Sequence, residues 1–274
     1  MPYIATAGYE PLPPTHSLVQ NRSLTVQVPS DSDTSLWVKA TSDYIQTVQA
    51  TIDGTDTKMG LTAKVKLGDM SKLDMLRTRQ AEVKGLQNQI SLVQNANRNA
   101  GFIFATSGYR TVSYGDKMDW AMDWSLTRLA NHRKMENIIR IPNLRLAEGF
   151  IDNVPADKWS TVVLGAQVRK MGRSTGWTRG KVNSIKAIMG NVGAEYGKEV
   201  RLYSIVGKNG SRFNLGGDLG SIVFGEEKTK EDQTGTWVGL LNAGDGLDQG
   251  YMVPISLVFE DIKRVTGCDT VELM

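Results

Sequence analysis

The C-terminal half of the sequence decides the fold, because short apolar stretches alternate there with glycine-rich turns. Its clearest part is GSIVFGE (220–226), followed by GTWVGLLNAG (235–244) and GYMVPISL (250–257). Similar stretches precede these at regular spacing, over residues 161–172, 176–189 and 198–207. Many short strands separated by glycine turns are typical of a β-sandwich or a β-barrel.

The period of the apolar residues changes between Ser71 and Ala96. Apolar residues recur there at spacings of three, four and seven: Leu73, Leu76, Val83, Leu86, Ile90 and Val93. This pattern predicts an amphipathic helix, which Gly85 weakens. Glutamines at seven-residue intervals, Gln80, Gln87 and Gln94, suggest a heptad-like seam. The helix is therefore expected either to pack on its own domain or to pair with a partner helix.

The N-terminal part of the chain begins with a proline-rich segment. Residues 1–20 hold four of the eight prolines without periodicity, so we expect an extended arm. Leu24, Val26 and Val28 alternate with polar residues and predict a strand. Further β-like stretches are expected at 43–57, 60–68 and 101–127, before a mixed connection over 128–160.

The composition excludes several classes of protein. A formal net charge of +3 over 274 residues is too small to indicate a nucleic-acid or an anionic-membrane partner. The single cysteine, Cys268, excludes an intramolecular disulfide and a cysteine-rich zinc site. Two histidines exclude a histidine cluster. With no signal-like start and no long apolar run, we expect a cytoplasmic protein that does not enter membranes.

The C-terminal half carries an ordered set of motifs. VRKMGRSTGWTRGKV (168–182) resembles a hairpin of the chymotrypsin-like serine proteases, the PA clan. NLGGDLGSIVF (214–224) resembles their nucleophile loop, G-D-S-G-S/G-x-V-F, and GTWVGLLNAG resembles the strand after it. Upstream, FATSGYR (104–110) and MDWAM (118–122) are similar to segments of uncharacterised fungal trypsin-like proteins. The resemblance covers about 101–127 and 160–265.

This resemblance implies a mainly β fold, the chymotrypsin-like double β-barrel. We expect an arm over 1–20, an atypical N-terminal barrel over 21–142 with a helical insertion at 71–96, and a second barrel over 155–274. A terminal helix is expected from about Ser256 to Val265, with Ser256 as its N-cap and Gly267 just after its end.

The resemblance also locates the positions of a Ser-His-Asp triad. Asp119 fills the carboxylate position, but Leu219 occupies the nucleophile position and has no heteroatom. The upstream His16 lies too close to the chain start to be the base, and His132 follows Asp119, on the wrong side in chain order. Since a triad needs all three groups, we expect a pseudoprotease, which is not an enzyme and has no catalytic residues.

The remnant of the oxyanion loop comprises Gly217, Asp218 and Leu219. The backbone N–H groups of Gly217 and Leu219 would be its donors, and Asp218 would brace the loop. Ser221 is expected to serve packing rather than to act as a shifted nucleophile. Cys268 is expected to be an inert free thiol.

Other chemistry receives less support. Asp116, Asp119 and Asp123 would share a face only on a helix, so no metal and no cofactor is expected. The segment 168–181 combines basic residues with Trp177, as single-stranded nucleic-acid sites do. We favour exposed charge on a hairpin for its basic residues, which are Arg169, Lys170, Arg173, Arg179 and Lys181.

The function expected from these residues is recognition without turnover. The chain is expected to bind a protein or peptide, along the cleft between the barrels or at a strand edge. The expected cleft residues are Leu219, Ser221, Asn242 and Gly244. One alternative is a self-assembling scaffold that uses the arm and the helix at 71–96. The other is an active serine hydrolase with unorthodox residues.

Overall fold

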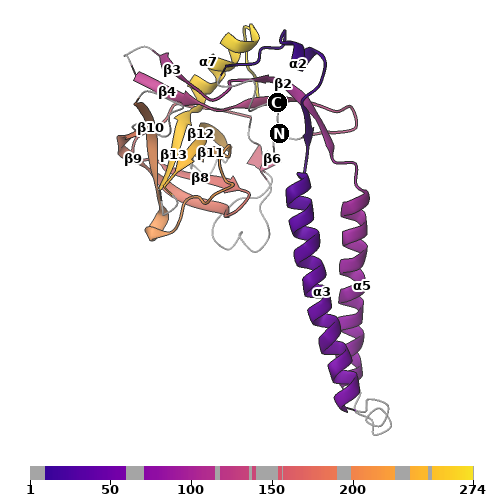
Figure 1. The fold of residues 1–274 in the computed structure, drawn as a ribbon. Coiled ribbons are helices and arrows are strands. Elements are labelled where there is room, and N and C mark those ends of the chain that lie inside the picture. Colours follow the sequence, from indigo (N-terminus) through magenta and orange to yellow (C-terminus); the bar gives the residue numbers. More distant parts are fainter. Residues whose placement is uncertain are drawn as a thin grey trace. The chain divides into compact units, whose positions relative to one another are not determined.

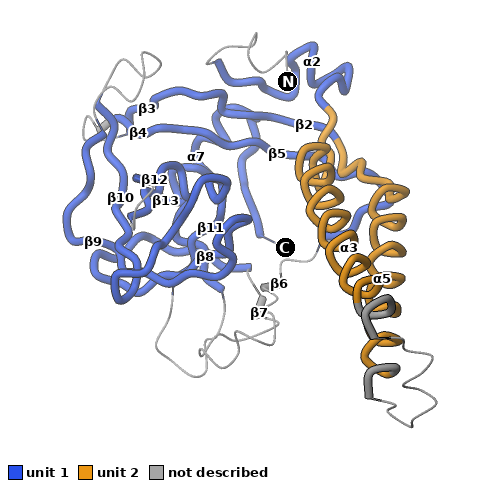
Figure 2. Tube along the Cα trace, turned by 60° about the horizontal axis from the view of Figure 1, so that its bottom comes forward, with its two compact units in different colours: residues 1–24, 102–274 blue, residues 25–101 orange. Residues whose placement is uncertain are grey.

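The computed structural model describes residues 10–59, 71–114, 118–135, 138–139, 154–155, 157–189, 199–225, 235–245 and 249–273. The chain divides into two compact units (Figure 2). Unit 1 comprises residues 1–24 and 102–274, and unit 2 comprises residues 25–101. Among the helices described, none has the length and apolar character needed to cross a membrane.

Unit 1 contains a closed barrel of antiparallel strands (Figure 1), which confirms the predicted mainly β fold. Its strands follow one another in the order β10-β13-β12-β11-β8-β9. Their bounds are Gln167–Gly172 (β8), Gly176–Met189 (β9), Val200–Gly207 (β10), Ile222–Gly225 (β11), Thr236–Gly244 (β12) and Gln249–Pro254 (β13). Five of the six lie entirely within the stretches predicted as strands, and β13 begins one residue before its predicted stretch.

The barrel interior is filled by apolar side chains that alternate with outward-facing ones along each strand. The buried cluster consists of Val168, Val182, Ile205, Phe213, Val223, Val238, Leu241 and Met252, all but Val238 at most 1% exposed. Gly239 is needed where β12 meets β13, because a Cβ there would lie 2.6 Å from the Met252 sulfur and 2.9 Å from the Val253 carbonyl oxygen. Close packing of this kind fixes one arrangement of strands.

The strands before the barrel form smaller sheets. β1 (Thr25–Gln27), β2 (Asn99–Thr106) and β5 (Ser125–Leu129) make a three-stranded sheet in the order β1-β2-β5. Two-stranded sheets are formed by β3 (Arg110–Tyr114) with β4 (Met118–Met122), and by β6 (Ile138–Ile139) with β7 (Val154–Pro155). The described residues thus close one barrel, and of the strands expected for the first barrel, those near 24–28 and within 101–127 lie in these small sheets.

The segment expected to be an extended arm is partly packed. Leu12 is buried and forms a bridge with Thr106, and Ser17–Gln20 form a short helix, α2, that the sequence did not predict. A 3-10 turn, η1 (Lys208–Gly210), follows β10. Residues 1–9 and the strand predicted at 60–68 lie outside the described residues.

The terminal helix α7 spans Ile255–Thr266 and confirms the predicted helix. Its N-cap position is Pro254 rather than Ser256, because the helix begins directly where β13 ends. Gly267 takes the left-handed conformation with φ 74°, and its N–H donates to the Lys263 carbonyl, as predicted for the C-terminus. The buried face of α7 packs on the strands through Ile255, Val258, Phe259 and Ile262.

A buried carboxylate fastens α7 to the strands. Asp261 is fully buried and accepts hydrogen bonds from the Arg110 and Arg264 guanidinium groups and from the Trp124 indole, all at 2.7–2.9 Å. These bonds link the helix to β3 and to the residues just after β4. Charge-assisted bonds of this kind are stronger than neutral ones and hold the helix in one register.

Unit 2 contains a helical hairpin, in which α3 (Asp31–Met59) and α5 (Ser71–Asn95) run side by side (Figure 1). α5 confirms the helix predicted at 71–96, and its partner is α3 of the same chain. Val48, Ile52, Leu76 and Val83 form the buried seam, with Ile45 packed against it. Gln80, Gln87 and Gln94 are exposed, so they do not contribute to this seam.

The β-like prediction for 43–57 is wrong, because these residues belong to α3. Ile45, Val48 and Ile52 are spaced by three and four, which places them on one helical face toward α5. Their β-branched side chains and the Asp53-Gly54 pair favoured a strand and a turn, yet Gly54 lies inside the helix. Packing against α5 overrides these local preferences.

Candidate ligand-binding site

A tight loop over residues 214–221 forms the centre of the candidate site, and Asp218 holds it in place. The Asp218 carboxylate is buried beside Lys170 on β8. It accepts hydrogen bonds from the Thr175 hydroxyl (2.7 Å), the N–H groups of Ser174 (2.7 Å) and Leu215 (3.0 Å), and the Lys170 ammonium group (3.0 Å). Asp218 is therefore the bracing carboxylate that the sequence suggested, and Lys170 is the partner that the sequence did not identify.

Both members of this ion pair are inaccessible, with 1% exposure for Asp218 and 0% for Lys170. Burial opposes ionisation of Asp218, but the hydrogen bonds from Thr175, Leu215 and Lys170 outweigh it and hold its pKa well below its usual value. Burial also lowers the pKa of Lys170, against the effect of Asp218. Each charge thus depends on the other, and the loop is tied to β8 through them.

Glycines shape the backbone on both sides of Leu219. Gly217 and Gly220 have φ of 96° and 84°, a region that favours glycine. A Cβ at Gly217 would also lie 2.6 Å from the Arg173 guanidinium. The Gly220 N–H donates to the Leu241 carbonyl at 2.8 Å, which anchors the loop to β12. The backbone around Leu219 is therefore tightly constrained.

Leu219 presents its side chain outward from this loop. It is 53% exposed and lines a pocket in unit 1. Two residues further on, the Ser221 hydroxyl donates to the Asp218 carbonyl at 2.5 Å, and Ser221 is not among the residues lining the pocket. The position of the expected nucleophile is thus occupied by hydrocarbon, and the nearby hydroxyl is used within the loop.

The other triad candidates do not gather around Leu219. Asp119 on β4 accepts a hydrogen bond from the Ser113 hydroxyl on β3 and does not line the pocket. The His16 ring caps α2, where its Nδ1 accepts from the Leu18 N–H at 3.2 Å. His132 lies exposed in a turn. Within the described residues, no imidazole lines the pocket that contains Leu219.

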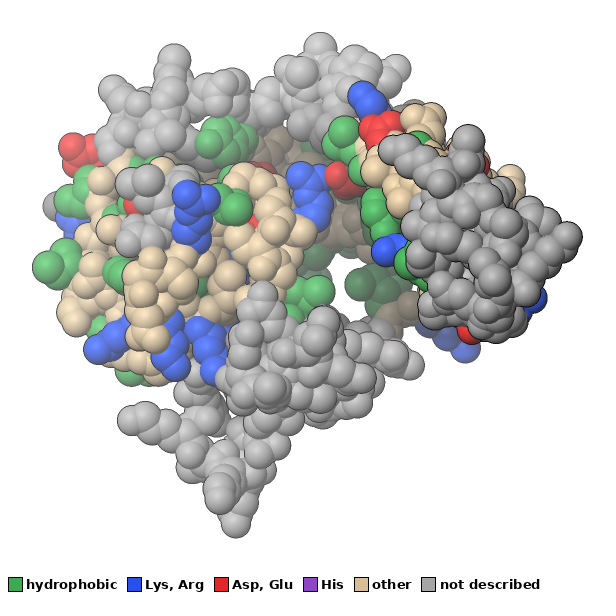
Figure 3. All heavy atoms as spheres, turned by 90° about the horizontal axis from the view of Figure 1, so that it is seen from below, with side chains coloured by type: hydrophobic (Ala, Val, Ile, Leu, Met, Phe, Trp, Pro, Cys, Tyr) green, Lys and Arg blue, Asp and Glu red, His purple; other side chains and the backbone are tan. Residues whose placement is uncertain are grey.

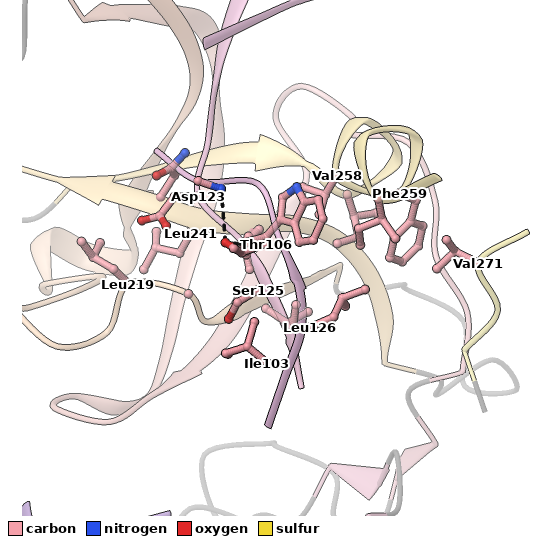
Figure 4. Close-up of a pocket in the computed structure, with 18 of the residues that line it drawn as sticks. Ile103, Thr106, Asp123, Ser125, Leu126, Leu219, Leu241, Val258, Phe259 and Val271 are labelled. Atoms are coloured by element: carbon pink, nitrogen blue, oxygen red, sulfur yellow. Dashed lines mark hydrogen bonds between the residues drawn. The ribbon is translucent and has the colours of Figure 1, made fainter. Parts of the chain in front are cut away.

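The pocket has a volume of about 760 Å³ and is walled mainly by apolar side chains (Figure 4). Leu219 and Leu241 lie at one end, while Val258, Phe259 and Val271 lie at the other. The remaining apolar walls are Leu12, Leu24, Ile103, Trp124, Leu126, Ile222, Trp237, Leu240, Ile255, Ile262 and Leu273. This size and character suit an organic ligand or several side chains of a peptide.

Two of the four predicted cleft residues line this pocket. They are Leu219 and Asn242, whose amide donates to the Ala121 carbonyl at 2.7 Å. Ser221 and Gly244 do not line it. Gly244 instead packs against Asn214, whose side chain occupies the space that a Cβ at Gly244 would need. Gly217 and Asp218 of the predicted oxyanion loop do not line the pocket either.

Sequence reasoning missed the far end of the pocket. That end includes one face of α7 and the tail after it, with Val271 and Leu273 packed on the same core. It also missed Asp123 and Trp124, which follow β4 directly. The repeated Asp-Trp pair, first at Asp119 and again at Asp123, was a signal that could have directed attention to the second copy.

The charged residues of the pocket are all acidic. Glu10, Asp123 and Glu272 line it, and no Lys, Arg or His does so within the described chain. Asp123 lies at the same end as Leu219 (Figure 4), and burial raises its pKa above the ordinary value. The guanidinium groups of Arg110 and Arg264 do not line the pocket, and both form ion pairs with Asp261. Every charged side chain that lines the pocket in the described chain is therefore a carboxylate.

The sites that the sequence disfavoured can be compared with the structure. Asp116 lies outside the described residues, and no group of three or more His, Cys, Asp or Glu able to hold a metal occurs in the described part. Lys170, Arg169 and Trp177 are buried, so the prediction of exposed charge is wrong for Arg169 and Lys170. On the face shown in Figure 3, Lys and Arg side chains lie at several places among hydrophobic and uncharged surface.

Cys268 is exposed after α7, within hydrogen-bonding distance of the Thr266 hydroxyl (3.1 Å), and it does not line the pocket. It is a free thiol, and its inertness stays a prediction.

Residues 109–270 match the model of peptidase family S64. The chain belongs to this family. The matching region runs from the start of β3 through α7, and it includes the loop with Leu219. The expected kinship with chymotrypsin-like serine proteases is thus confirmed at the level of family and fold. The helical hairpin of unit 2 lies outside the matching region.

Solved structures of bacterial serine proteases are similar to this S64 chain, although distantly. Protease A of Thermobifida fusca is 18% identical with a TM-score of 0.40, covering 60% of this chain and 73% of its own. Cellulomonas bogoriensis chymotrypsin is 14% identical with a TM-score of 0.38, covering 61% and 74%. Nocardiopsis protease is 14% identical with a TM-score of 0.36, covering 57% and 69%. No curated protein matches the chain.

Proposed function

We propose that this S64 family member is a catalytically inactive homologue that binds a peptide segment in the pocket beside Leu219. The observation that carries the proposal is Leu219 itself, exposed on a braced loop at the position where a serine would stand. A leucine side chain cannot form an acyl-enzyme, but it can make an apolar contact with a bound chain.

The missing groups remove each step of triad catalysis. A nucleophile must lose its proton to a base within hydrogen-bonding reach, and a carboxylate must orient that base. Here His16 caps a helix, and Asp119 is bonded to Ser113. In serine proteases, loss of the nucleophile or of the base lowers kcat by as much as about 10⁶-fold. Leu219 and the absent imidazole together leave no route to acyl transfer.

The loop that would support catalysis is nevertheless maintained. Burying the charges of Lys170 and Asp218 and holding glycines in the left-handed region both cost free energy. We therefore expect this loop to have a role in folding or in binding. A rigid loop beside an apolar pocket lowers the entropy lost when a partner binds. Recognition is therefore the use that best fits a loop of this kind with leucine in place of serine.

Two measurements on the full chain test this proposal. A fluorophosphonate probe should label neither the wild-type chain nor Leu219→Ser, because serine at this position still has no imidazole beside it. An immobilised peptide array should show binders that Leu219→Arg loses. Leu164→Arg is the matched control, since Leu164 is similarly exposed (50%) and does not line the pocket.

Stoichiometric labelling of the wild-type chain would overturn the loss of catalysis and revive an active hydrolase. An array without any binder sensitive to Leu219→Arg would overturn the binding role.

The helical hairpin favours a second candidate, a self-assembling scaffold. Leu36, Trp37 and Leu92 are exposed apolar residues on α3 and α5. If the hairpin drives assembly, light scattering on the full chain should show a particle that Leu36→Lys and Leu92→Lys dissociate. Deleting residues 1–20 would be a poor test, because buried Leu12 and Val19 would be lost. A monomer at all concentrations would contradict this candidate.

A further inference from the structure

The charged residues that line the pocket suggest which peptide sequences it would bind, because all of them are acidic. Its acidic lining residues are Glu10, Asp123 and Glu272, and no described lining residue is basic. Asp123 and Glu272 form no hydrogen bond or ion pair within the described part of the chain. An anionic occupant would have to desolvate beside these carboxylates, whereas a cationic one would gain from them.

The acidic residues of the pocket belong to both of its ends. Asp123 lies at the end that contains Leu219 and Leu241, and Glu272 directly follows Val271, which lies at the opposite end (Figure 4). Between these ends the walls are mainly apolar and include Ile103 and Leu126, with the hydroxyl groups of Thr106 and Ser125 among them (Figure 4). The complementary occupant is therefore apolar in its middle and positively charged toward one or both of its ends.

An edge strand beside the pocket favours a peptide over a compact small molecule. β5 is the last strand in the sheet order β1-β2-β5, and no described strand pairs with its other side. Its residues Ser125 and Leu126 line the pocket. An extended segment can add main-chain hydrogen bonds to such an edge while its side chains enter the cavity.

We propose that the pocket recognises an extended peptide segment that carries apolar side chains together with a Lys or Arg side chain, drawn by Asp123 and Glu272. The proposal rests on the peptide-binding role proposed above and names the partner class of the same pocket. The carboxylates would favour a peptide with a Lys or Arg side chain over one with an acidic side chain. The apolar walls would supply the affinity that all apolar peptides share.

The test uses the full chain and three fluorescein-labelled peptides of about ten residues, alike in Leu, Val and Ala content. They differ in carrying Lys, Gln or Glu at the same positions, and fluorescence anisotropy gives each Kd. The Lys peptide should bind about tenfold more tightly than the Glu peptide at low salt, with the Gln peptide between them. Added salt should reduce this ratio.

The variants separate the pocket carboxylates from the rest of the surface. Asp123→Asn combined with Glu272→Gln should reduce the ratio between the Lys and Glu peptides to about twofold, while the Gln peptide keeps its affinity. Glu260→Gln is the matched control, since Glu260 is exposed on α7 and does not line the pocket. It should leave all three affinities unchanged, and circular dichroism should confirm that each variant is folded.

Each other outcome overturns a stated claim. Equal affinity for the three peptides would overturn the charge preference and leave the peptide-binding role intact. A Lys preference that survives Asp123→Asn with Glu272→Gln would also overturn the inference, because the cation would then bind elsewhere. Failure of all three peptides, together with an array that has no binder sensitive to Leu219→Arg, would overturn the peptide-binding role itself.

Discussion

The barrel of unit 1 and the helical hairpin of unit 2 bury their apolar residues to different depths. Ile205, Phe213, Val223 and Met252 in the barrel are 0% exposed. The buried seam of the hairpin consists of Val48, Ile52, Leu76 and Val83, at 6–8% exposed. Six strands can enclose side chains on all sides, whereas two helices share one narrow interface. The barrel is thus the more strongly determined region.

The largest expected effect comes from breaking the buried pair that joins the barrel to its loop. Asp218→Asn should lower the free energy of unfolding by about 3–5 kcal/mol, because the Lys170 charge would remain buried without its partner. Urea unfolding followed by tryptophan fluorescence measures this loss. Asp269→Asn, an exposed carboxylate in the same unit, is the control and should change little. A loss below about 1 kcal/mol would contradict the assigned role of the pair.

Leucine truncations compare the two regions directly. Leu241→Ala in the barrel should cost about 3–4 kcal/mol, and Leu76→Ala in the hairpin about 2 kcal/mol, because the more enclosed site leaves the larger cavity. Urea unfolding monitored by circular dichroism gives both values. An equal or reversed order would break the comparison between barrel and hairpin.

Acid should affect the barrel through Asp218. Its pKa is lower in the folded chain than in the unfolded chain, so its contribution to stability is complete above the unfolded pKa of about 3.9. That contribution is lost as the pH falls from about 4 toward the folded pKa. Unfolding curves at decreasing pH should therefore show a steeper loss for the wild-type chain than for Asp218→Asn. Parallel curves would show that another group dominates.

The smallest effect is expected in the hairpin. Gly85 lies inside α5, and a Cβ there would meet nothing within 4 Å. Gly85→Ala should therefore raise the free energy of unfolding by about 0.5–1 kcal/mol, since alanine has the better helix propensity. Gly54→Ala in α3 is the matched second case, with the same open space. A loss of stability in either variant, measured by thermal unfolding, would show an unrecognised contact.

The sequence predicted the barrel well for a physical reason. Its strands are short, bounded by glycines, and alternate between buried and outward residues, so local pattern and final structure agree. The seam of α5 was equally regular, with Leu76 and Val83 seven residues apart. In α3 the same spacing was present at Ile45, Val48 and Ile52, but β-branched composition obscured it. Its helical state depends on α5, which a local pattern does not reveal.

The sequence predicts the part of the candidate site around Leu219, but not the residues that come to it from distant segments of the chain. Leu219, Asp218 and Asn242 were found because they belong to one motif and the strand after it. Lys170, Glu10 and the tail residue Val271 come from distant segments, and their place depends on how the chain folds back on itself. Nothing in the sequence around these residues distinguishes them, and only the folded chain shows that they lie close to the site.

The most direct test of the account combines binding with a search for turnover. The full chain is incubated with the fluorescein-labelled Lys peptide, its anisotropy is followed, and the peptide is then examined by mass spectrometry. We expect saturable binding that Leu219→Arg weakens and Leu164→Arg does not, with the peptide recovered intact. A cleaved peptide in the wild-type sample, absent with Leu219→Arg, would contradict it.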